Sequence, residues 1–248
     1  MELLIRGWGQ EMKMLEREQL CIELLRKLPQ KFVLVGGYAA SSFEFPRFSV
    51  DLDLVIQEKD VKEFARILEG EGFELATNAK EFNTFYKGRF MRFEKRIGGL
   101  PVSVDLLVNA IQARQTGTAY SFDYIRENSE IRRVLGSGTR ESAEVRVADR
   151  EMLIALKMNS MRATDQRDII TLCNGKIEVQ KIAGHLRIAP QEKILKSMDI
   201  ILGTLGNPSV KDSIKGVFGI PDKVYENMIE KAKQDILSIR KILSDAKT

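Results

Sequence analysis

The sequence predicts an α/β (α+β) protein, in which a mixed sheet is flanked by helices and is followed by a helical C-terminal region. Two apolar runs predict buried strands. The run 33–35 stops at two glycines, and the run 102–108 is apolar on both faces except at one serine and one aspartate. From residue 149 onward the pattern is almost wholly helical. We therefore expect a sheet-containing domain over residues 1–148 and a helical region over residues 149–248.

The other predicted elements follow from hydrophobic periodicity and from glycine and proline breaks. Glu11 to Leu28 has the pattern of an amphipathic helix, and Asp60 to Gly70 places its apolar side chains on one helical face. Asn207-Pro208 and Ile220-Pro221 interrupt the C-terminal helices, and a charged helix is expected over Lys223 to Ala246. Strands are expected near 73–75, 84–87, 90–97 and 102–108.

Composition limits the chemistry. The chain has 248 residues, is 44% hydrophobic and carries a net charge of +4, and it contains no run of eighteen apolar residues. We expect a cytoplasmic protein with no membrane partner. Cys21 and Cys173 lie far apart without histidines at zinc spacing, so core packing is their expected use. Because His185 is the only histidine, carboxylates and a hard cation are the expected chemistry.

Two aspartates mark the strand that follows the glycine pair. In an extended strand Asp51 and Asp53 point to one face, while Leu52 and Leu54 point to the other. Like charges held this close repel, and a divalent cation would neutralise them. Taken alone, the alternation also fits a half-solvated strand. The metal interpretation predicts a magnesium or manganese site at Asp51 and Asp53.

The glycine pair suggests the rest of the ligand. Gly36 and Gly37 let the backbone turn after a strand and approach a ligand closely. The segment after them could open a helix whose free N–H groups bind phosphate. A dinucleotide-binding turn is the alternative, but it requires a third glycine where this chain has Tyr38-Ala39-Ala40. A metal-bridged triphosphate suits both the glycines and the acids.

Asp105 is the third carboxylate. It lies in the run 102–108, which reads as a central strand, where an unpaired charge would cost several kcal/mol. We therefore expect Asp105 to have a cation or a catalytic task. With Asp51 and Asp53 it would complete the three carboxylates that two-metal phosphoryl transfer uses.

These motifs resemble a known family. Gly36-Gly37, then RFSVDLDL over 47–54, then Asp105 on its own strand, is similar to the polymerase-β-type nucleotidyltransferases. The RxSxDxD form, with the later stretch 149–169, resembles the AbiEii/AbiGii toxin nucleotidyltransferases, and the resemblance covers about two-thirds of the chain. Within 149–169 the matching positions are Lys157, Arg162, Asp165 and Asp168.

The resemblance implies an enzyme that transfers a nucleoside monophosphate from an NTP to an acceptor hydroxyl and releases pyrophosphate. Residues 1–148 would be the catalytic domain, and 149–248 would complete the active-site cleft. Asp51, Asp53 and Asp105 would hold the metal, and Lys157 would offset charge on the triphosphate. The implied nucleotide-binding residues are Gly36, Gly37, Arg47, Ser49, Asp165 and Asp168.

A continuous helix through 149–169 would support this role of Lys157. At about 100° per residue, Lys157, Met161, Asp165 and Asp168 would share one face. The alternative is an ordinary solvated helix face with no role in binding.

The acceptor is the open question. The resemblance implies a toxin-like enzyme acting on RNA, at the acceptor end of tRNA, with a possible antitoxin-like protein partner. The basic and aromatic stretch 85–96 could grip an RNA backbone and stack a base, or could be a hairpin with one solvated face. A small-molecule acceptor of the antibiotic type, a protein acceptor and a non-catalytic nucleotide-binding module are the alternatives.

Overall fold

The computed structural model describes residues 2–83, 85–139 and 141–245. The chain forms two compact units. The first, called the sheet unit, comprises 1–42, 46–111 and 120–148, and the second, called the helical unit, comprises 43–45, 112–119 and 149–248. Two short segments from the first 148 residues thus belong to the helical unit. The expected role of residues 149–248 in an active-site cleft stays a prediction.

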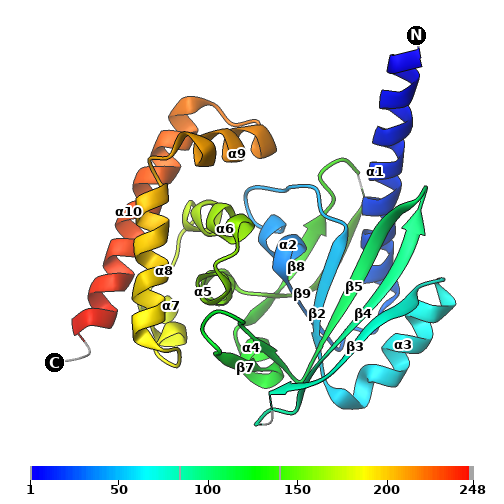
Figure 1. The fold of residues 1–248 in the computed structure, drawn as a ribbon, viewed down its shortest axis with the longest axis horizontal. Helices are drawn as coiled ribbons and strands as arrows, with labels where there is room; N and C mark the ends of the chain where they lie inside the picture. Colours follow the sequence, from blue (N-terminus) through cyan, green and yellow to red (C-terminus); the bar gives the residue numbers. More distant parts are fainter. Residues whose placement is uncertain (1, 84, 140, 246–248) are drawn as a thin grey trace. The chain divides into compact units, whose positions relative to one another are not determined.

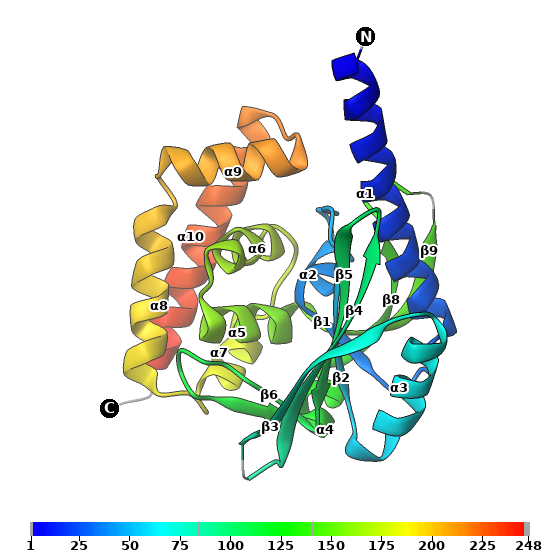
Figure 2. The ribbon, with the colours of Figure 1, turned by 45° about the vertical axis from the view of Figure 1, so that its right-hand side comes forward.

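The sheet unit is built on a seven-stranded mixed sheet with the strand order β3-β4-β5-β2-β1-β9-β8. Central strand β2 pairs in parallel with β5 and antiparallel with β1, and β1 pairs in parallel with β9. Strands β2, β4 and β5 lie side by side in both views (Figures 1 and 2). The strands of this sheet are β1 (Val33–Val35), β2 (Asp51–Ile56), β3 (Glu74–Asn83), β4 (Gly88–Ile97), β5 (Leu100–Val108), β8 (Ser129–Leu135) and β9 (Ser142–Ala148).

Alternation along the central strands separates a core face from a polar face. Leu52, Leu54, Val104 and Leu106 are completely buried. On the opposite face stand Asp51 and Asp53 of β2 and Ser103 and Asp105 of β5. The apolar face excludes water and fixes the strand register, because a shift by one residue would exchange the two faces.

Helices and short strands complete the sheet unit. The long helix α1 contacts β4, β5 and β9, and the short helix α2 contacts β1, β2 and β8. The strand pair β6 (Ala110–Gln112) and β7 (Ala119–Ser121) forms a second small sheet. The helices are α1 (Glu2–Lys27), α2 (Gly36–Ser41), the 3-10 helix η1 (Glu58–Asp60), α3 (Val61–Gly70) and α4 (Phe122–Glu127).

The helical unit follows the predicted breaks. Asn207 caps α9 and Pro208 stands at its first turn, where a missing N–H costs nothing. Gly219 ends α9 in the left-handed conformation. Helix α10 contacts α6, α7 and α8 (Figure 1). The helices of this unit are α5 (Arg150–Ser160), α6 (Ala163–Cys173), α7 (Val179–Leu186), α8 (Gln191–Thr204), α9 (Pro208–Phe218) and α10 (Asp222–Asp245).

The predicted fold class, a mixed sheet with flanking helices and a helical C-terminal region, is confirmed. The continuous helix over 149–169 is wrong, because α5 ends at Ser160 and Met161 has a φ of 47°. The Asp165 side chain accepts a hydrogen bond from the Arg162 backbone N–H at 2.9 Å, and this capping interaction starts a new helix.

The strand expected near 84–87 is also wrong where the structure describes it. Residues 85–87 form the turn between β3 and β4, and Lys87 has a φ of 51°, while residue 84 lies outside the described residues. Strands β8 and β9 were not predicted; the alternation of β8 is weak, whereas β9 buries Ala143, Val145 and Val147 at every second position. Across the described residues, none of the helices is long and apolar enough to cross a membrane.

Candidate active site

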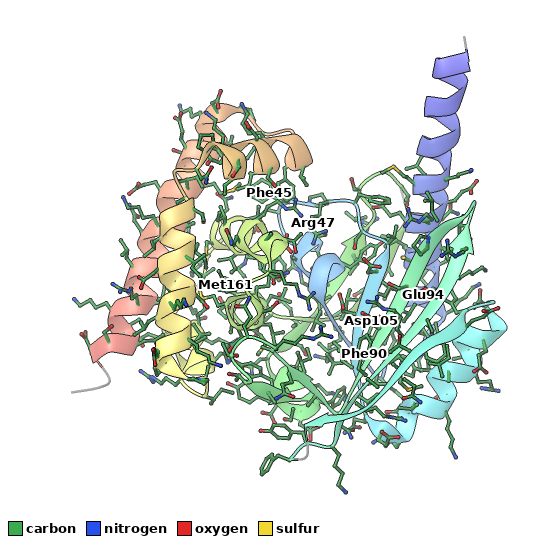
Figure 3. All side chains as sticks on the ribbon, viewed as in Figure 1. Phe45, Arg47, Phe90, Glu94, Asp105 and Met161 are labelled. Atoms are coloured by element: carbon green, nitrogen blue, oxygen red, sulfur yellow. The ribbon has the colours of Figure 1, made fainter. Side chains whose placement is uncertain are left out.

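Three aspartates meet on the polar face of the sheet. In the parallel pairing of β2 with β5, Asp53 lies opposite Asp105, and Asp51 lies opposite Ser103. Directly opposite residues point to the same face, so all three carboxylates share it. Asp51 is exposed, Asp53 is half-buried and Asp105 is buried. We call Asp51, Asp53 and Asp105 the carboxylate face; Figure 3 labels Asp105 on its strand.

The glycine pair stands beside this face. Gly36 follows Val35, which pairs with Asp53, and its φ of 71° is readily adopted only by glycine. A Cβ at Gly36 would lie 1.9 Å from Oδ2 of Asp53. The carboxylate therefore occupies the space that a side chain at Gly36 would fill, which explains the need for glycine on both conformational and steric grounds.

The second glycine lies close to the two polar residues of the RxS motif. A Cβ at Gly37 would lie 3.0 Å from the guanidinium of Arg47 and 3.1 Å from Oγ of Ser49. Ser49 is buried, and its carbonyl accepts a 2.7 Å hydrogen bond from the Tyr38 hydroxyl. The structure thus brings together Gly36, Gly37, Arg47 and Ser49, four of the six expected nucleotide-binding residues.

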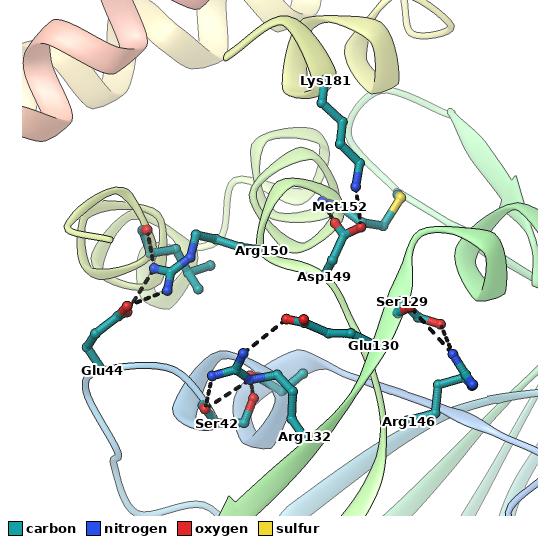
Figure 4. Close-up of polar contacts among 12 residues, drawn as sticks. Ser42, Glu44, Ser129, Glu130, Arg132, Arg146, Asp149, Arg150, Met152 and Lys181 are labelled. Carbon is teal, nitrogen blue, oxygen red and sulfur yellow. Dashed lines mark hydrogen bonds and ion pairs between the residues drawn. The ribbon is translucent and has the colours of Figure 1, made fainter. Parts of the chain in front are cut away.

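The end of the glycine helix α2 is held by an arginine from β8. Arg132 donates two hydrogen bonds to the Ser42 carbonyl, at 2.9 and 3.2 Å (Figure 4). The last carbonyls of a helix have no intrahelical partner, so a guanidinium there both satisfies them and favours the helix dipole. This contact fixes the six-residue helix that positions Gly36 and Gly37.

Asp105 has a cation partner that the sequence analysis missed. The Nε and Nη2 atoms of Arg92 donate to the two carboxylate oxygens of Asp105, each at 2.7 Å. This bidentate pair raises the pKa of Arg92 above its ordinary value. The signal was present in the sequence. Gly98-Gly99, both at positive φ, form a two-residue hairpin turn that pairs Ile97 with Leu100 and so sets Arg92 opposite Asp105.

The remaining candidate residues gather within the helical unit. Nζ of Lys157 lies 2.7 Å from Oδ2 of Asp168 and 3.4 Å from Oδ1 of Asp165. All three side chains are buried: the exposed fraction is 8% for Lys157, 9% for Asp165 and 2% for Asp168. Although the helix is broken at Met161, the turn back into α6 brings both acids to the lysine. We call Lys157, Asp165 and Asp168 the lysine cluster.

Contacts of two residues, Asp149 and Arg150, fix the start of α5, which carries Lys157. Asp149 caps the helix by accepting a 2.8 Å hydrogen bond from the Met152 N–H, and it also pairs with Lys181 of α7 (Figure 4). Arg150 donates to Glu44 and lies 4.5 Å from the Phe43 ring centre, which ties segment 43–45 to the helical unit.

The basic strand β4 is more internally paired than the sequence suggested. Arg89 pairs with Glu58, and Arg92 pairs with Asp105. Lys95 donates to the Glu71 carbonyl, and Arg96 donates to the Gly99 carbonyl. At the hairpin tip, by contrast, Phe85 is 83% exposed, and its ring packs edge-on against Tyr86. The exposed aromatic tip is thus distinct from the paired basic strand.

The chemistry of the carboxylate face fits a divalent metal ion. Carboxylate oxygens are the ligands that Mg²⁺ and Mn²⁺ prefer, and Asp53 and Asp105 approach from adjacent strands. Asp51 accepts a hydrogen bond from Ser103, and Asp105 is held by Arg92. Among the described residues, no cluster of three or more His, Cys, Asp or Glu side chains is already arranged to hold a metal ion.

Comparison with solved structures shows the fold. The chain is similar to a candidate nucleotidyltransferase from H. pylori, with 17% identity, 94% of this chain and 97% of that chain covered, and a TM-score of 0.50. It also matches JHP933 from Helicobacter pylori, with 16% identity, 96% and 95% coverage, and a TM-score of 0.46. Comparison with curated proteins gives no match. At these identities the likeness shows the fold, which is that of a nucleotidyltransferase.

The family follows from the sequence. The model of the family described as "Nucleotidyl transferase AbiEii toxin, Type IV TA system" matches residues 23–178. This span includes the glycine pair, the carboxylate face and the lysine cluster, and it exceeds half of the chain. The chain belongs to the AbiEii nucleotidyltransferase family and is an enzyme of the nucleotidyltransferase type, as the motif resemblance predicted.

Proposed function

We propose that this enzyme transfers a nucleoside monophosphate from an NTP to an acceptor hydroxyl with release of pyrophosphate, and that it depends on a divalent metal ion. The observation that carries the proposal is the parallel register of β2 with β5, which sets Asp53 beside Asp105 with Asp51 two residues away on the same face. Three carboxylates on one face of the sheet repel one another, and a bound cation would reduce this repulsion.

Asp51, Asp53 and Asp105 would hold Mg²⁺ or Mn²⁺. When bound, the metal would polarise the α-phosphate and lower the pKa of the acceptor hydroxyl. Asp105, on the central strand β5, would help to accept the hydroxyl proton, and the sheet would keep the carboxylates at fixed separation. The buried side of the sheet supports this role, because Leu52 and Val104 leave the strands no freedom to rotate.

The phosphates would lie against the glycine pair. Gly36 and Gly37 carry no side chain, and Arg47 offers a guanidinium close to Gly37. Ser49 would contribute a hydroxyl donor from a fixed position, since its backbone is tied to Tyr38. From the family resemblance, Lys157 would offset charge on the triphosphate, and Asp165 and Asp168, which pair with this lysine, would contribute to nucleotide binding.

The proposed acceptor is RNA, at the acceptor end of tRNA, and the family description supports an antitoxin partner. The exposed aromatic tip supports RNA, because a ring that is 83% exposed can stack on an unpaired base. Arg89 and Lys95 of the basic strand already have intramolecular partners. The exposed aromatic tip is therefore the stronger support for RNA binding.

The test of the reaction uses purified protein, magnesium, total cellular RNA and each α-labelled NTP in turn. Label should enter the tRNA band with the intact protein and not with Asp51→Ala. Asp212→Ala, which removes an exposed aspartate on α9, is the matched control and should retain activity. Transfer that persists in Asp51→Ala would refute the metal proposal. Label on protein or small molecules alone would refute the RNA acceptor.

The test of the RNA surface is Phe85→Ala. Loss of one stacking ring should weaken RNA binding by about 1–3 kcal/mol, measured as the Kd for labelled tRNA at fixed salt. Leu75→Ala removes a side chain that is 45% exposed on β3 and should leave the Kd unchanged. Equal effects of the two substitutions would exclude base stacking at the hairpin tip.

A further inference from the structure

The pair between Arg92 and Asp105 differs from an ordinary surface ion pair. The guanidinium holds both carboxylate oxygens at 2.7 Å, and the Asp105 side chain is 9% exposed whereas that of Arg92 is 40% exposed. The acid is therefore buried in the sheet, while its partner on the neighbouring strand is partly exposed. Only the arginine has room to leave.

Arg92 stands at the place from which a cation would reach Asp105. Cross-strand pairing puts Arg92, Asp105 and Asp53 in one row across β4, β5 and β2. A bound guanidinium neutralises the carboxylate and repels a second positive charge a few ångströms away. A metal ion at Asp105 and a guanidinium on the same two oxygens thus exclude each other.

We propose that Arg92 competes with a divalent cation for Asp105, so that Asp105 becomes a metal ligand only after Arg92 has released it. This inference rests on the proposed function of the carboxylate face. It assigns Arg92 as a positioning residue that keeps the buried acid paired while no metal is bound. The triphosphate of an incoming nucleotide offers the released guanidinium a new anionic partner.

The neighbouring pair on the same strand provides a comparison. Arg89 also forms a 2.8 Å ion pair, with Glu58, but the Glu58 side chain is 56% exposed and lies outside the carboxylate face. An exposed pair of this kind contributes little to stability and should not affect metal binding. Arg89→Ala is therefore a matched control for Arg92→Ala.

The experiment measures Mn²⁺ binding by the full-length protein without nucleotide, using electron paramagnetic resonance to count free and bound ions. Removing a bidentate charged hydrogen-bond partner should tighten Mn²⁺ binding of Arg92→Ala by about tenfold or more. The gain should disappear in the double variant Arg92→Ala with Asp105→Asn. Arg92→Lys, which keeps the charge but loses the bidentate geometry, should give a smaller gain, and it serves if Arg92→Ala fails to fold.

The outcomes separate this inference from the function on which it rests. Arg89→Ala should bind Mn²⁺ as the unaltered protein does. If Arg92→Ala and Arg92→Lys bind Mn²⁺ no more tightly than the unaltered protein while Asp51→Asn loses binding, the metal site stands and the competition is refuted. If Asp51→Asn leaves Mn²⁺ binding unchanged, the metal site of the proposed function is itself refuted. A gain in Arg92→Ala that survives Asp105→Asn would also overturn the competition.

Discussion

The carboxylate face and the lysine cluster contain similar groups in different surroundings. Each contains aspartates paired with basic side chains, Arg92 in the first and Lys157 in the second, where Arg167, outside the cluster, also lies 3.9 Å from Asp168. On the carboxylate face, Asp51 is exposed and Arg92 is 40% exposed. In the lysine cluster, no side chain is more than 9% exposed.

The difference teaches which charges are available for a ligand. Two buried acids that share one lysine are already compensated, so their main effect is on the folded state, and loss of one partner leaves a buried charge. On the carboxylate face three acids share one side of the sheet and the arginine that holds Asp105 is partly exposed, so this face suits a cation. Substitutions should therefore affect catalysis on the carboxylate face and stability in the lysine cluster.

The largest expected effect is on catalysis at the carboxylate face. Asp53→Asn keeps the shape that packs against Gly36 but removes the charge, so the transfer rate should fall by about 10³-fold or more. The free energy of unfolding, measured in urea, should change by less than about 1 kcal/mol. If Asp53→Asn kept its activity or unfolded, the expectation that the carboxylate face acts in catalysis and the lysine cluster in stability would be contradicted.

The next effect is on stability at the lysine cluster. Lys157→Met removes the lysine that the buried Asp165 and Asp168 share, although Asp168 also has Arg167 at 3.9 Å, and it should cost about 3–5 kcal/mol of unfolding free energy. Lys231→Met breaks a partly exposed i,i+4 pair with Asp235 and should cost less than about 0.5 kcal/mol. Urea denaturation measures both, and equal losses would show that burial of the cluster is not what matters.

A smaller effect is expected at Gly36, the glycine beside the carboxylate face, and Gly99 in the turn between β4 and β5 serves as its control. Gly99→Ala, at a φ of 84° with open space around it, should cost about 1 kcal/mol for the backbone conformation alone. Gly36→Ala adds a collision with the Asp53 carboxylate and should cost at least about 2 kcal/mol. It should also weaken Mn²⁺ binding, which Gly99→Ala should not. Similar behaviour of the two variants would argue against the close packing of Gly36 and Asp53.

The smallest effect concerns pH in the helical unit. Burial lowers the pKa of His185 below its ordinary value of 6.5, against the opposing charge of Asp149. The unfolded chain therefore binds a proton first, so the stability contributed by His185 is present above pH 6.5 and is lost as the pH falls through the folded-state pKa. Since His185 is the only histidine, His185→Gln should flatten stability between pH 7 and 5.5, measured by thermal unfolding. If stability fell with pH as steeply in His185→Gln as in the unaltered protein, the pH dependence would come from carboxylates.

Much of the fold and the carboxylate face could be predicted, because both rest on local patterns. Period-two alternation placed Asp51 and Asp53 on one face, and proline and glycine breaks located the C-terminal helices. The break at Met161 could not be found in this way, because a left-handed methionine and a capping aspartate leave the helical pattern of the sequence intact. Lys157 meets Asp165 and Asp168 through a turn and not along one helix.

Non-local pairing was harder to predict than local pattern. The basic stretch around Arg92 left an RNA-binding surface and a half-solvated hairpin both open, and neither alternative contained its pairing with Asp105, which the hairpin turn at Gly98-Gly99 sets up. Strand β8 was not predicted because it is an edge strand with a weak alternation, whereas β9, between β1 and β8, does alternate and was also not predicted.

The parallel register of β2 with β5 has a consequence for folding itself. A slip of one residue would turn Asp51 and Asp53 into the space now filled by Leu52 and Leu54, and it would bury charge without compensation. The same acids that suit the chemistry thus penalise misaligned pairing while the chain folds. Neutralising these acids would remove the penalty on misaligned strand pairing. Variants that lack the charges should therefore form misfolded or aggregated chains more often, even where the folded protein is equally stable.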